Sequence, residues 1–224
     1  MNIEKIFQTK SLLITSFIII ISSVYYLNQK WNAYPVLTTA EKYLVATYPK
    51  LIPANSPREG TAQGELVAVM YFNPDHPSSP LNYRQIKDLL ISYPQKFYIV
   101  FRYIPKSDNS KFIVRVLEAA RKQKLFWKAY EYLMVNYQSW GKSFQKSPKA
   151  VWDILRSTDI DIQKLKEDMN DIDIEDLIER DLQSAEELKV LGDFQFFING
   201  EGISNKNAEQ LKLFIQSRFM APAN

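Results

Sequence analysis

The most informative stretch of the sequence is Val69-Met70-Tyr71-Phe72-Asn73-Pro74-Asp75-His76-Pro77-Ser78-Ser79-Pro80. It continues a nearly unbroken apolar segment that begins at Glu65, which is typical of a central strand covered on both faces. The prolines and serines that follow favour the start of a helix, where a backbone N–H is not needed or is bonded by a side chain. The stretch therefore predicts a junction between a buried strand and a helix.

A second apolar run, Phe97 to Ile104, ends at Pro105 and predicts another strand. The residues between the two strands are apolar at helical spacing: Leu81, Ile86, Leu89, Leu90 and Tyr93. Strand, helix and strand follow one another closely enough to predict a parallel crossover unit.

After Pro105 the pattern becomes helical as far as about residue 188, and Phe194 to Ile198 then reads as a short strand. Asn199-Gly200 favours a tight hairpin turn, because both residues tolerate positive φ. The stretch 208–219 reads as a last amphipathic helix. The fold class predicted is α/β, with a helical insertion over about residues 106–188.

Residues 30–64 contain prolines and a turn-rich run, so we interpret them as a lead-in to one folded domain at 65–220. Residues 1–10 form a short cytoplasmic N-terminus in this interpretation. Residues 11–29 form a transmembrane anchor, since the chain carries no charge from residue 11 to 27 and the run is about 17 residues long. Tyr25, Tyr26 and Trp31 follow as interface anchors.

A cleaved signal peptide is the alternative for this segment, but Tyr25 and Tyr26 occupy positions where a cleavage site needs small residues. Lys5 and Lys10 precede the span and Lys30 alone follows it closely, which favours a single-pass protein whose C-terminal domain lies outside the cytoplasm.

Three segments share their order and spacing with motifs of a known family. Phe126-Trp127 begins a helix in the insertion, residues 161–166 read DIQKLK, and residues 192–200 read GDFQFFING. They resemble the FW helix, the D-x-x-K-F-K segment and the G-T-P-T-F-F-I-N-G loop of DsbA-like proteins, a branch of the thioredoxin superfamily. The resemblance covers about residues 65–219, and it implies a thioredoxin-like fold with a helical insertion.

The resemblance places His76 at the nucleophilic cysteine of the Cys-x-x-Cys motif, Pro77 and Ser78 between the two cysteines, and Ser79 at the resolving cysteine. Phe194 stands at the proline that follows a cis peptide bond, and we expect a trans bond here because cis costs about 2.5–4 kcal/mol before other residues. The chain contains no cysteine. Thiol–disulfide exchange runs through a thiolate, so this chain cannot perform it with its own residues.

Four interpretations of the replaced motif remain open. Asp75 or His76 caps the helix, Pro77 occupies its first turn, and the hydroxyls of Ser78 and Ser79 bond free backbone N–H groups. Alternatively, these N–H groups and hydroxyls bind an anion. A hydrolase using His76 and Ser79 is a remote third possibility. A metal site is the fourth and is disfavoured because His76 is the only histidine, so we predict no metal and no cofactor.

Charge is divided unevenly along the chain. Residues 84–149 contain fourteen Lys and Arg against four Asp and Glu, whereas residues 159–187 contain three against twelve. Solvated helix faces explain such runs, and an oriented docking surface or a contact with anionic lipid is the alternative. No motif of a nucleic-acid reader is present, so nucleic acid is not an expected partner.

The active family holds extended peptide at the face around its cysteines and cis-proline loop. By resemblance, His76, Pro77, Asp193 and Phe194 form the expected partner-binding surface. We therefore predict a redox-inactive protein of the bacterial inner membrane that binds protein partners in the periplasm. Its expected role is that of a scaffold subunit of an envelope complex, such as a secretion or conjugation system. A thiol-independent periplasmic chaperone is the alternative.

Overall fold

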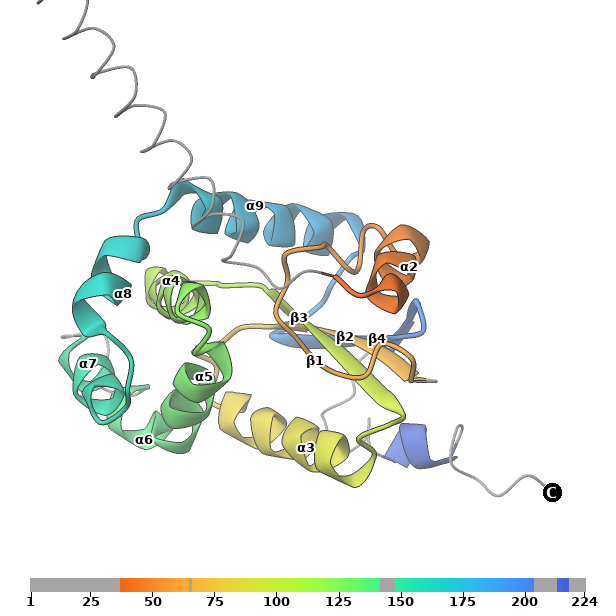
Figure 1. The fold of residues 1–224 in the computed structure, drawn as a ribbon, viewed down its shortest axis with the longest axis horizontal. Coiled ribbons are helices and arrows are strands. Elements are labelled where there is room, and N and C mark those ends of the chain that lie inside the picture. Colours follow the sequence, from red (N-terminus) through yellow and green to blue (C-terminus); the bar gives the residue numbers. More distant parts are fainter. Residues whose placement is uncertain (1–36, 65, 142–147, 204–212, 218–224) are drawn as a thin grey trace, which may run out of the picture. The chain divides into compact units, whose positions relative to one another are not determined.

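The computed structural model describes residues 37–64, 66–141, 148–203 and 213–217 (Figure 1). The strands are β1 (Arg58–Gly60), β2 (Leu66–Phe72), β3 (Phe97–Tyr103), β4 (Phe194–Ile198) and β5 (Glu201–Ile203). The helices are α2 (Thr39–Thr47), α3 (Ser79–Ser92), α4 (Asp108–Lys122), α5 (Phe126–Val135), α6 (Tyr137–Trp140), α7 (Lys149–Arg156), α8 (Ile162–Asp168) and α9 (Ile172–Glu187). Residues 213–217 are also helical, whereas the rest of the predicted C-terminal helix lies outside the described residues.

The strands form one sheet in the order β1-β3-β2-β4-β5. β2 pairs in parallel with β3, and α3 connects the two, so the predicted crossover unit is confirmed. β4 runs antiparallel to β2 on its other side. This pairing brings Phe194, at the start of β4, opposite Phe72, at the end of β2. Two segments more than a hundred residues apart in sequence therefore meet at one end of the sheet.

The predicted hairpin turn at Asn199-Gly200 is also confirmed. It joins β4 to β5, which are paired antiparallel, and both of its residues have positive φ, 47° and 83°. Such a pair matches the mirror-image turn that fits the right-handed twist of a hairpin. Asn199 also bonds β2 through its side-chain oxygen, which accepts from the Val67 N–H at 2.8 Å.

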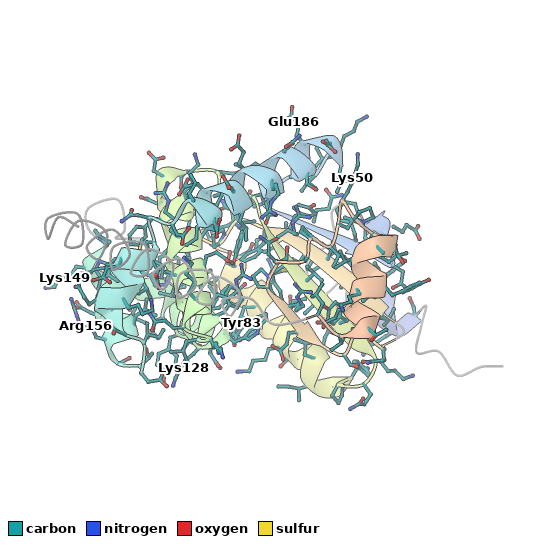
Figure 2. The ribbon with its side chains drawn as sticks, turned by 45° about the horizontal axis from the view of Figure 1, so that its top comes forward. Lys50, Tyr83, Lys128, Lys149, Arg156 and Glu186 are labelled. Carbon is teal, nitrogen blue, oxygen red and sulfur yellow. The ribbon has the colours of Figure 1, made fainter. Side chains whose placement is uncertain are left out.

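The prediction that residues 30–64 are only a lead-in is wrong for residues 37–64. β1 extends the sheet antiparallel to β3, and Leu44, Leu51 and Ile52 are buried against it. Lys50 forms an ion pair with Glu187 at the end of α9, with 2.9 Å between Nζ and Oε2. Figure 2 labels Lys50 near this end of α9. The segment covers one face of the sheet, a role that its prolines and turn residues conceal in the sequence.

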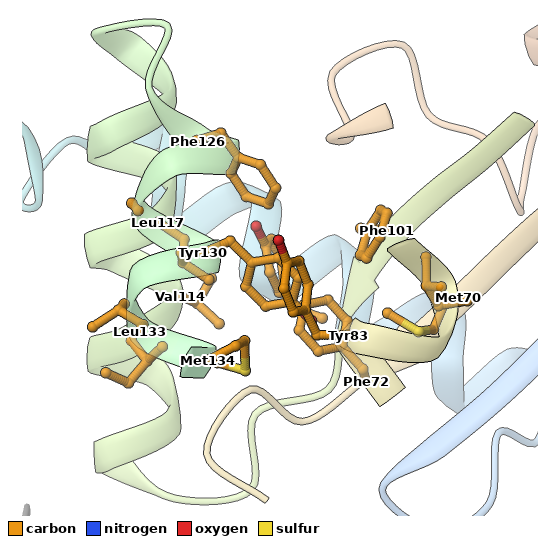
Figure 3. Close-up of a cluster of buried hydrophobic side chains, with 14 of the residues drawn as sticks. Met70, Phe72, Tyr83, Phe101, Val114, Leu117, Phe126, Tyr130, Leu133 and Met134 are labelled. Atoms are coloured by element: carbon orange, nitrogen blue, oxygen red, sulfur yellow. The ribbon is translucent and has the colours of Figure 1, made fainter. Parts of the chain in front are cut away.

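The sheet is covered on both faces, which confirms the prediction made from the nearly unbroken apolar run of β2. Side chains alternate along β2, so Met70 and Phe72 join the larger cluster with α3 and the helices that follow β3, while Val69 and Tyr71 join a smaller one. Figure 1 shows α2 and α9 on one side of the sheet and α3 on the other. Figure 3 shows the larger cluster, where Tyr130 of α5 lies among aromatic rings.

The helices between β3 and β4 that the structure describes fall within residues 106–188, the range of the predicted insertion. The last of them, α9, contributes Ala185 to the smaller cluster. A buried ion pair joins this helix to the sheet: Arg102 Nε of β3 lies 2.6 Å from Asp181 Oδ1 of α9. The second carboxylate oxygen accepts from the Tyr103 N–H at 2.8 Å. We name these contacts the Arg102–Asp181 joint.

The predicted anchor, residues 11–29, lies outside the described residues. In the part of the chain that the structure describes, none of the helices combines the length and the apolar character that a membrane crossing requires.

Candidate functional site

The candidate site is the loop that connects β2 to α3, together with the start of β4. The Asn73 N–H donates to the Asp193 carbonyl at 3.0 Å. This bond fixes the beginning of the loop against the residue that precedes β4. The Ser79 hydroxyl donates to the Asn73 carbonyl at 2.9 Å and is fully buried. The loop is therefore closed on itself before the helix begins.

The prediction for the helix start is wrong in its details. The helix begins at Ser79, so Pro77 precedes it, and Pro80 is the proline in its first turn. No side chain caps the helix. The Ser79 hydroxyl bonds a loop carbonyl and not a free helix N–H. The cause is the extra turn at residues 73–79, in which the Ser79 N–H bonds the His76 carbonyl at 2.9 Å.

His76 lies at the centre of the site and is partly exposed. Its Nδ1 atom lies 2.7 Å from the Ser78 hydroxyl and accepts from the Ser78 N–H at 3.2 Å. Its Nε2 atom faces Asp193, with 3.7 Å to Oδ2. Its ring meets the ring of Phe194 edge-on, at 6.0 Å between centroids. Three of the four predicted partner-binding residues are thus in contact, and the fourth, Pro77, is exposed on the same loop.

Asp193 connects the parts of the site. Asn73 Nδ2 donates to its Oδ1 at 3.1 Å, and Lys106 Nζ lies 3.3 Å from the same oxygen. Burial opposes ionisation of this carboxyl, but the hydrogen bonds from Asn73 and Lys106 and the nearby His76 outweigh burial and lower its pKa. Asp193 is therefore a carboxylate at neutral pH, and it holds three separate segments together.

Phe194 has the geometry that its sequence context predicts. The described residues contain no cis peptide bond, so the bond before Phe194 is trans, as expected. Its ring is half-buried and stacks on Phe72 at 6.4 Å between centroids. One side of the ring is thus held by the core, and the rest remains available at the surface.

The structure does not assemble the predicted hydrolase pair. Ser79 is buried and bonded to a carbonyl, so Ser78 and not Ser79 is the serine beside His76. The Asp75 carboxylate accepts from the Ser107 hydroxyl at 3.0 Å. A base within reach of an accessible nucleophile is required for such catalysis, and His76 and Ser79 do not meet that requirement.

The anion-binding interpretation also loses its donors. The Ser78 N–H bonds His76, the Ser79 N–H bonds the His76 carbonyl, and the Asn82 N–H bonds the Ser78 carbonyl at 3.0 Å. Pro80 has no N–H to offer. The backbone N–H groups named here are therefore bonded within the loop and the helix, and they are not available to an anion.

Sequence reasoning missed three residues of the site. Asn73 and Lys106 both contact Asp193, and the Tyr137 hydroxyl of α6 donates to the Asp75 carbonyl at 2.6 Å. Asn73 directly follows β2, and Lys106 lies a few residues after the end of β3. Both strands were predicted from the sequence. Because parallel strands end at the same edge of a sheet, that shared position was the available signal.

The basic segment 84–149 and the acidic segment 159–187 form ion pairs with each other. Ion pairs join basic residues of 84–149 to acidic residues of 159–187: Arg102–Asp181, Arg115–Glu175, Lys122–Asp171 and Lys128–Asp159. Figure 2 shows Lys128 on the outer surface of the helical region. Part of the charge asymmetry in the sequence is therefore neutralised within the domain.

No protein-family model matches this sequence, and no curated protein matches it. Solved structures do. A thioredoxin-like oxidoreductase from Silicibacter pomeroyi DSS-3 is 20% identical, with a TM-score of 0.65 over 78% of this chain and 98% of that one. Wolbachia pipientis alpha-DsbA1 is 16% identical, with a TM-score of 0.65 over 80% and 95%. The catalytic domain of Proteus mirabilis ScsC is 19% identical, with a TM-score of 0.62 over 79% and 97%.

The chain has the DsbA-like thioredoxin fold. It lacks cysteine altogether, so it is a degenerate form of that fold with respect to thiol chemistry. The DsbA-like fold here carries a polar network around Asp193 at the end of the sheet where the resemblance places the Cys-x-x-Cys motif.

Proposed function

We propose that this chain is a redox-inactive DsbA-like protein that works by binding other proteins, as a scaffold subunit of a bacterial envelope complex. The observation that carries the proposal is the replaced motif. His76 and Ser79 stand at the two cysteine positions, and Asp193 and Lys106 fix the loop around them. A fixed surface without thiols fits stoichiometric binding better than turnover.

The binding surface in this proposal consists of His76, Pro77, Asp193 and Phe194. Pro77 is exposed, and the half-buried ring of Phe194 is held in one orientation by Phe72. An aromatic ring that is already oriented loses little conformational freedom on binding, which is why such residues dominate interface energetics. Asp193, which lies beside His76 and Lys106, provides polar contacts around this apolar centre.

A membrane anchor at residues 11–29 supports a fixed position in the envelope. The segment is uncharged from residue 11 to 27, is followed by aromatic residues and is flanked by lysines, and its charge bias favours a cytoplasmic N-terminus. In this proposal the protein is a single-pass protein of the inner membrane, and the DsbA-like domain lies in the periplasm.

The test is photo-crosslinking in the native membrane from a benzoylphenylalanine placed at Phe194. The matched control places it at Tyr43, an aromatic residue of α2 that is 70% exposed and belongs to the other side of the sheet. One dominant protein captured from Phe194 but not from Tyr43 supports the scaffold. A ladder of unrelated envelope proteins supports the chaperone instead, and no product at Phe194 overturns the proposed surface.

A second variant separates binding from folding. Phe194→Asp places a charge at the centre of the surface, and we expect co-purification of the captured protein to fall at least tenfold, about 1.4 kcal/mol. Tyr43→Asp introduces the same charge elsewhere and leaves co-purification unchanged. Circular dichroism of both variants checks that each remains folded.

A further inference from the structure

Ser78 and His76 are in direct contact in the loop before α3, and the contact fixes where their protons lie. The Ser78 N–H can only donate, and it points to His76 Nδ1 at 3.2 Å, so this nitrogen carries no proton. The Ser78 hydroxyl lies 2.7 Å from the same nitrogen and is therefore the donor. The serine proton is thus already directed at an imidazole base.

Asp193 lies on the other side of the imidazole ring. The ring proton of neutral His76 is on Nε2, and Nε2 faces the Asp193 carboxylate, with 3.7 Å to Oδ2. This separation exceeds a hydrogen bond, as is common at catalytic sites before a substrate is bound. Asn73 and Lys106 hold the second carboxylate oxygen at 3.1 and 3.3 Å. A carboxylate in this place stabilises the imidazolium that forms when the base accepts a proton.

Asn82 places a side-chain amide beside the serine. It lies one helical turn after Ser78 and is 3% exposed, and its Nδ2 donates to the Ser78 hydroxyl oxygen at 3.4 Å. A fixed amide this close to a nucleophile is the kind of donor that stabilises the negative oxygen of a tetrahedral intermediate. Ser78 and His76 are both partly exposed, so the hydroxyl is open to an ester from solvent. Nucleophile, base, orienting carboxylate and amide donor therefore meet in this loop.

We infer that Ser78 is an activated nucleophile that takes the acyl group of a carboxylic ester. The Ser78 proton passes to His76 Nδ1 as Oγ bonds the ester carbonyl carbon, and the oxyanion forms beside the Asn82 amide. The bond from this carbon to the alkoxy oxygen then breaks, and the leaving alcohol takes the proton from Nδ1. Water that gives a proton to the same nitrogen later releases the acid and restores Ser78. In this scheme Asp193 is a positioning residue.

The nucleophile differs from the one that the sequence suggested. The sequence alternative paired His76 with Ser79, because Ser79 stands at a cysteine position, but Ser79 is fully buried. The reactive hydroxyl is one residue earlier. This activity goes beyond the proposed function and does not depend on it, because acylation of Ser78 needs no protein partner.

The test treats the full chain, purified in detergent, with p-nitrophenyl acetate and locates the acetyl group by peptide mass spectrometry. We expect the first acetyl group on Ser78. Release of p-nitrophenol should fall about tenfold in Ser78→Ala, where the imidazole can react only on its own. Ser157→Ala removes an exposed serine that follows α7, and as the matched control it keeps the full rate. Circular dichroism checks that each variant is folded.

Two further variants test the base and its carboxylate. His76→Gln removes the base, and we expect acetylation of Ser78 to fall about a hundredfold. Asp193→Asn should lower the rate about tenfold and move the acid side of the pH profile to lower pH, because the imidazolium loses its neighbouring carboxylate. A purely structural role of Asp193 would not move the profile. Lys106 and Asp75, two further charged groups at the site, are unchanged in both variants.

Three results overturn the inference. They are the absence of an acetyl group on Ser78, equal p-nitrophenol release by Ser78→Ala and the unmodified chain, and acetylation of Ser78 that persists in His76→Gln. In the second case His76 reacts with the ester directly and Ser78 serves only the turn. None of these outcomes bears on the capture of a protein from Phe194, so failure here is distinguishable from failure of the proposed function.

Discussion

Two aspartates secure the ends of neighbouring strands in this protein, and they differ in almost every other respect. Asp181 belongs to the Arg102–Asp181 joint, and its side chain is 2% exposed. Asp193 holds the candidate site together, and its side chain is 27% exposed. Burial raises the pKa of Asp181 to about 6 although Arg102 opposes this, whereas hydrogen bonds and nearby cations lower the pKa of Asp193 despite burial.

The difference teaches which contacts maintain the fold and which shape the surface. The Arg102 guanidinium makes further bonds to the carbonyls of Lys50 and Leu51, at 2.8 and 3.1 Å, and lies 5.0 Å above the ring of Tyr71. The joint therefore connects the segment 37–64, through Lys50 and Leu51, to the sheet and to α9 in the interior. The Asp193 network connects loops that water also reaches, so its partners contribute less to stability.

The largest expected effect comes from breaking the buried joint. Arg102→Met leaves the Asp181 carboxylate in the interior without a cation, and we expect the free energy of unfolding to fall by about 3–5 kcal/mol. Denaturant unfolding monitored by circular dichroism measures the loss.

The control for this prediction is the double variant Arg102→Met/Asp181→Asn, which removes the buried charge as well. We expect it to be more stable than Arg102→Met alone, because its interior holds no unpaired ion. A single variant with a loss below about 1 kcal/mol would contradict the structural role of the joint.

A smaller effect is expected where the site meets the core. Ser79→Ala removes the hydroxyl that donates to the Asn73 carbonyl, while the His76 N–H continues to donate to the same carbonyl at 3.2 Å. We expect a loss of about 1 kcal/mol in the free energy of unfolding. Ser78→Ala, at the more exposed neighbour, is the matched control and should cost less. Equal losses for both variants would show that burial of Ser79 does not matter.

Much of the sheet could be predicted from the sequence, since β2 and β3 are apolar runs of strand-forming residues and Asn199-Gly200 specifies its own turn. Residues 37–64 could not, because Leu44, Leu51 and Ile52 are scattered among turn residues and show no periodicity. Their burial depends on a surface that exists only after the sheet has formed.

For the candidate site, the resemblance brought His76 and Phe194 together from distant parts of the chain. It did not reveal Asn73 or Lys106, whose roles arise from how close the loops lie in space. The local sequence pattern also could not show that the helix starts only at Ser79. The Ser78 N–H donates to the His76 side chain in an additional turn before the helix, and this contact is not visible in the sequence. Polar contacts between loops leave no periodic signal in a sequence.

The smallest expected effect distinguishes Asp193 from Asp181 most directly. Asp193→Asn removes the charge that Lys106 and His76 face, and we expect a loss of about 0.5–1 kcal/mol at pH 7, since Lys106 is half exposed. The pKa of Asp193 is lower in the folded chain than in the unfolded chain. Its contribution is therefore complete above the unfolded value, near 3.8, and is lost as the pH falls through the lowered folded value.

The difference in unfolding free energy between the unmodified chain and Asp193→Asn should thus keep its full value at pH values above about 4 and should shrink as the pH falls below about 4. Urea titrations at several pH values measure it. Salt sharpens the comparison, because screening weakens the half-exposed Asp193 network but has little effect on the buried joint. A difference that grew as the pH fell below about 4 would mean that the Asp193 carboxylate destabilises the site. In that case the ordering of the loop would rest on the hydrogen bonds of Asn73 and Ser79 alone.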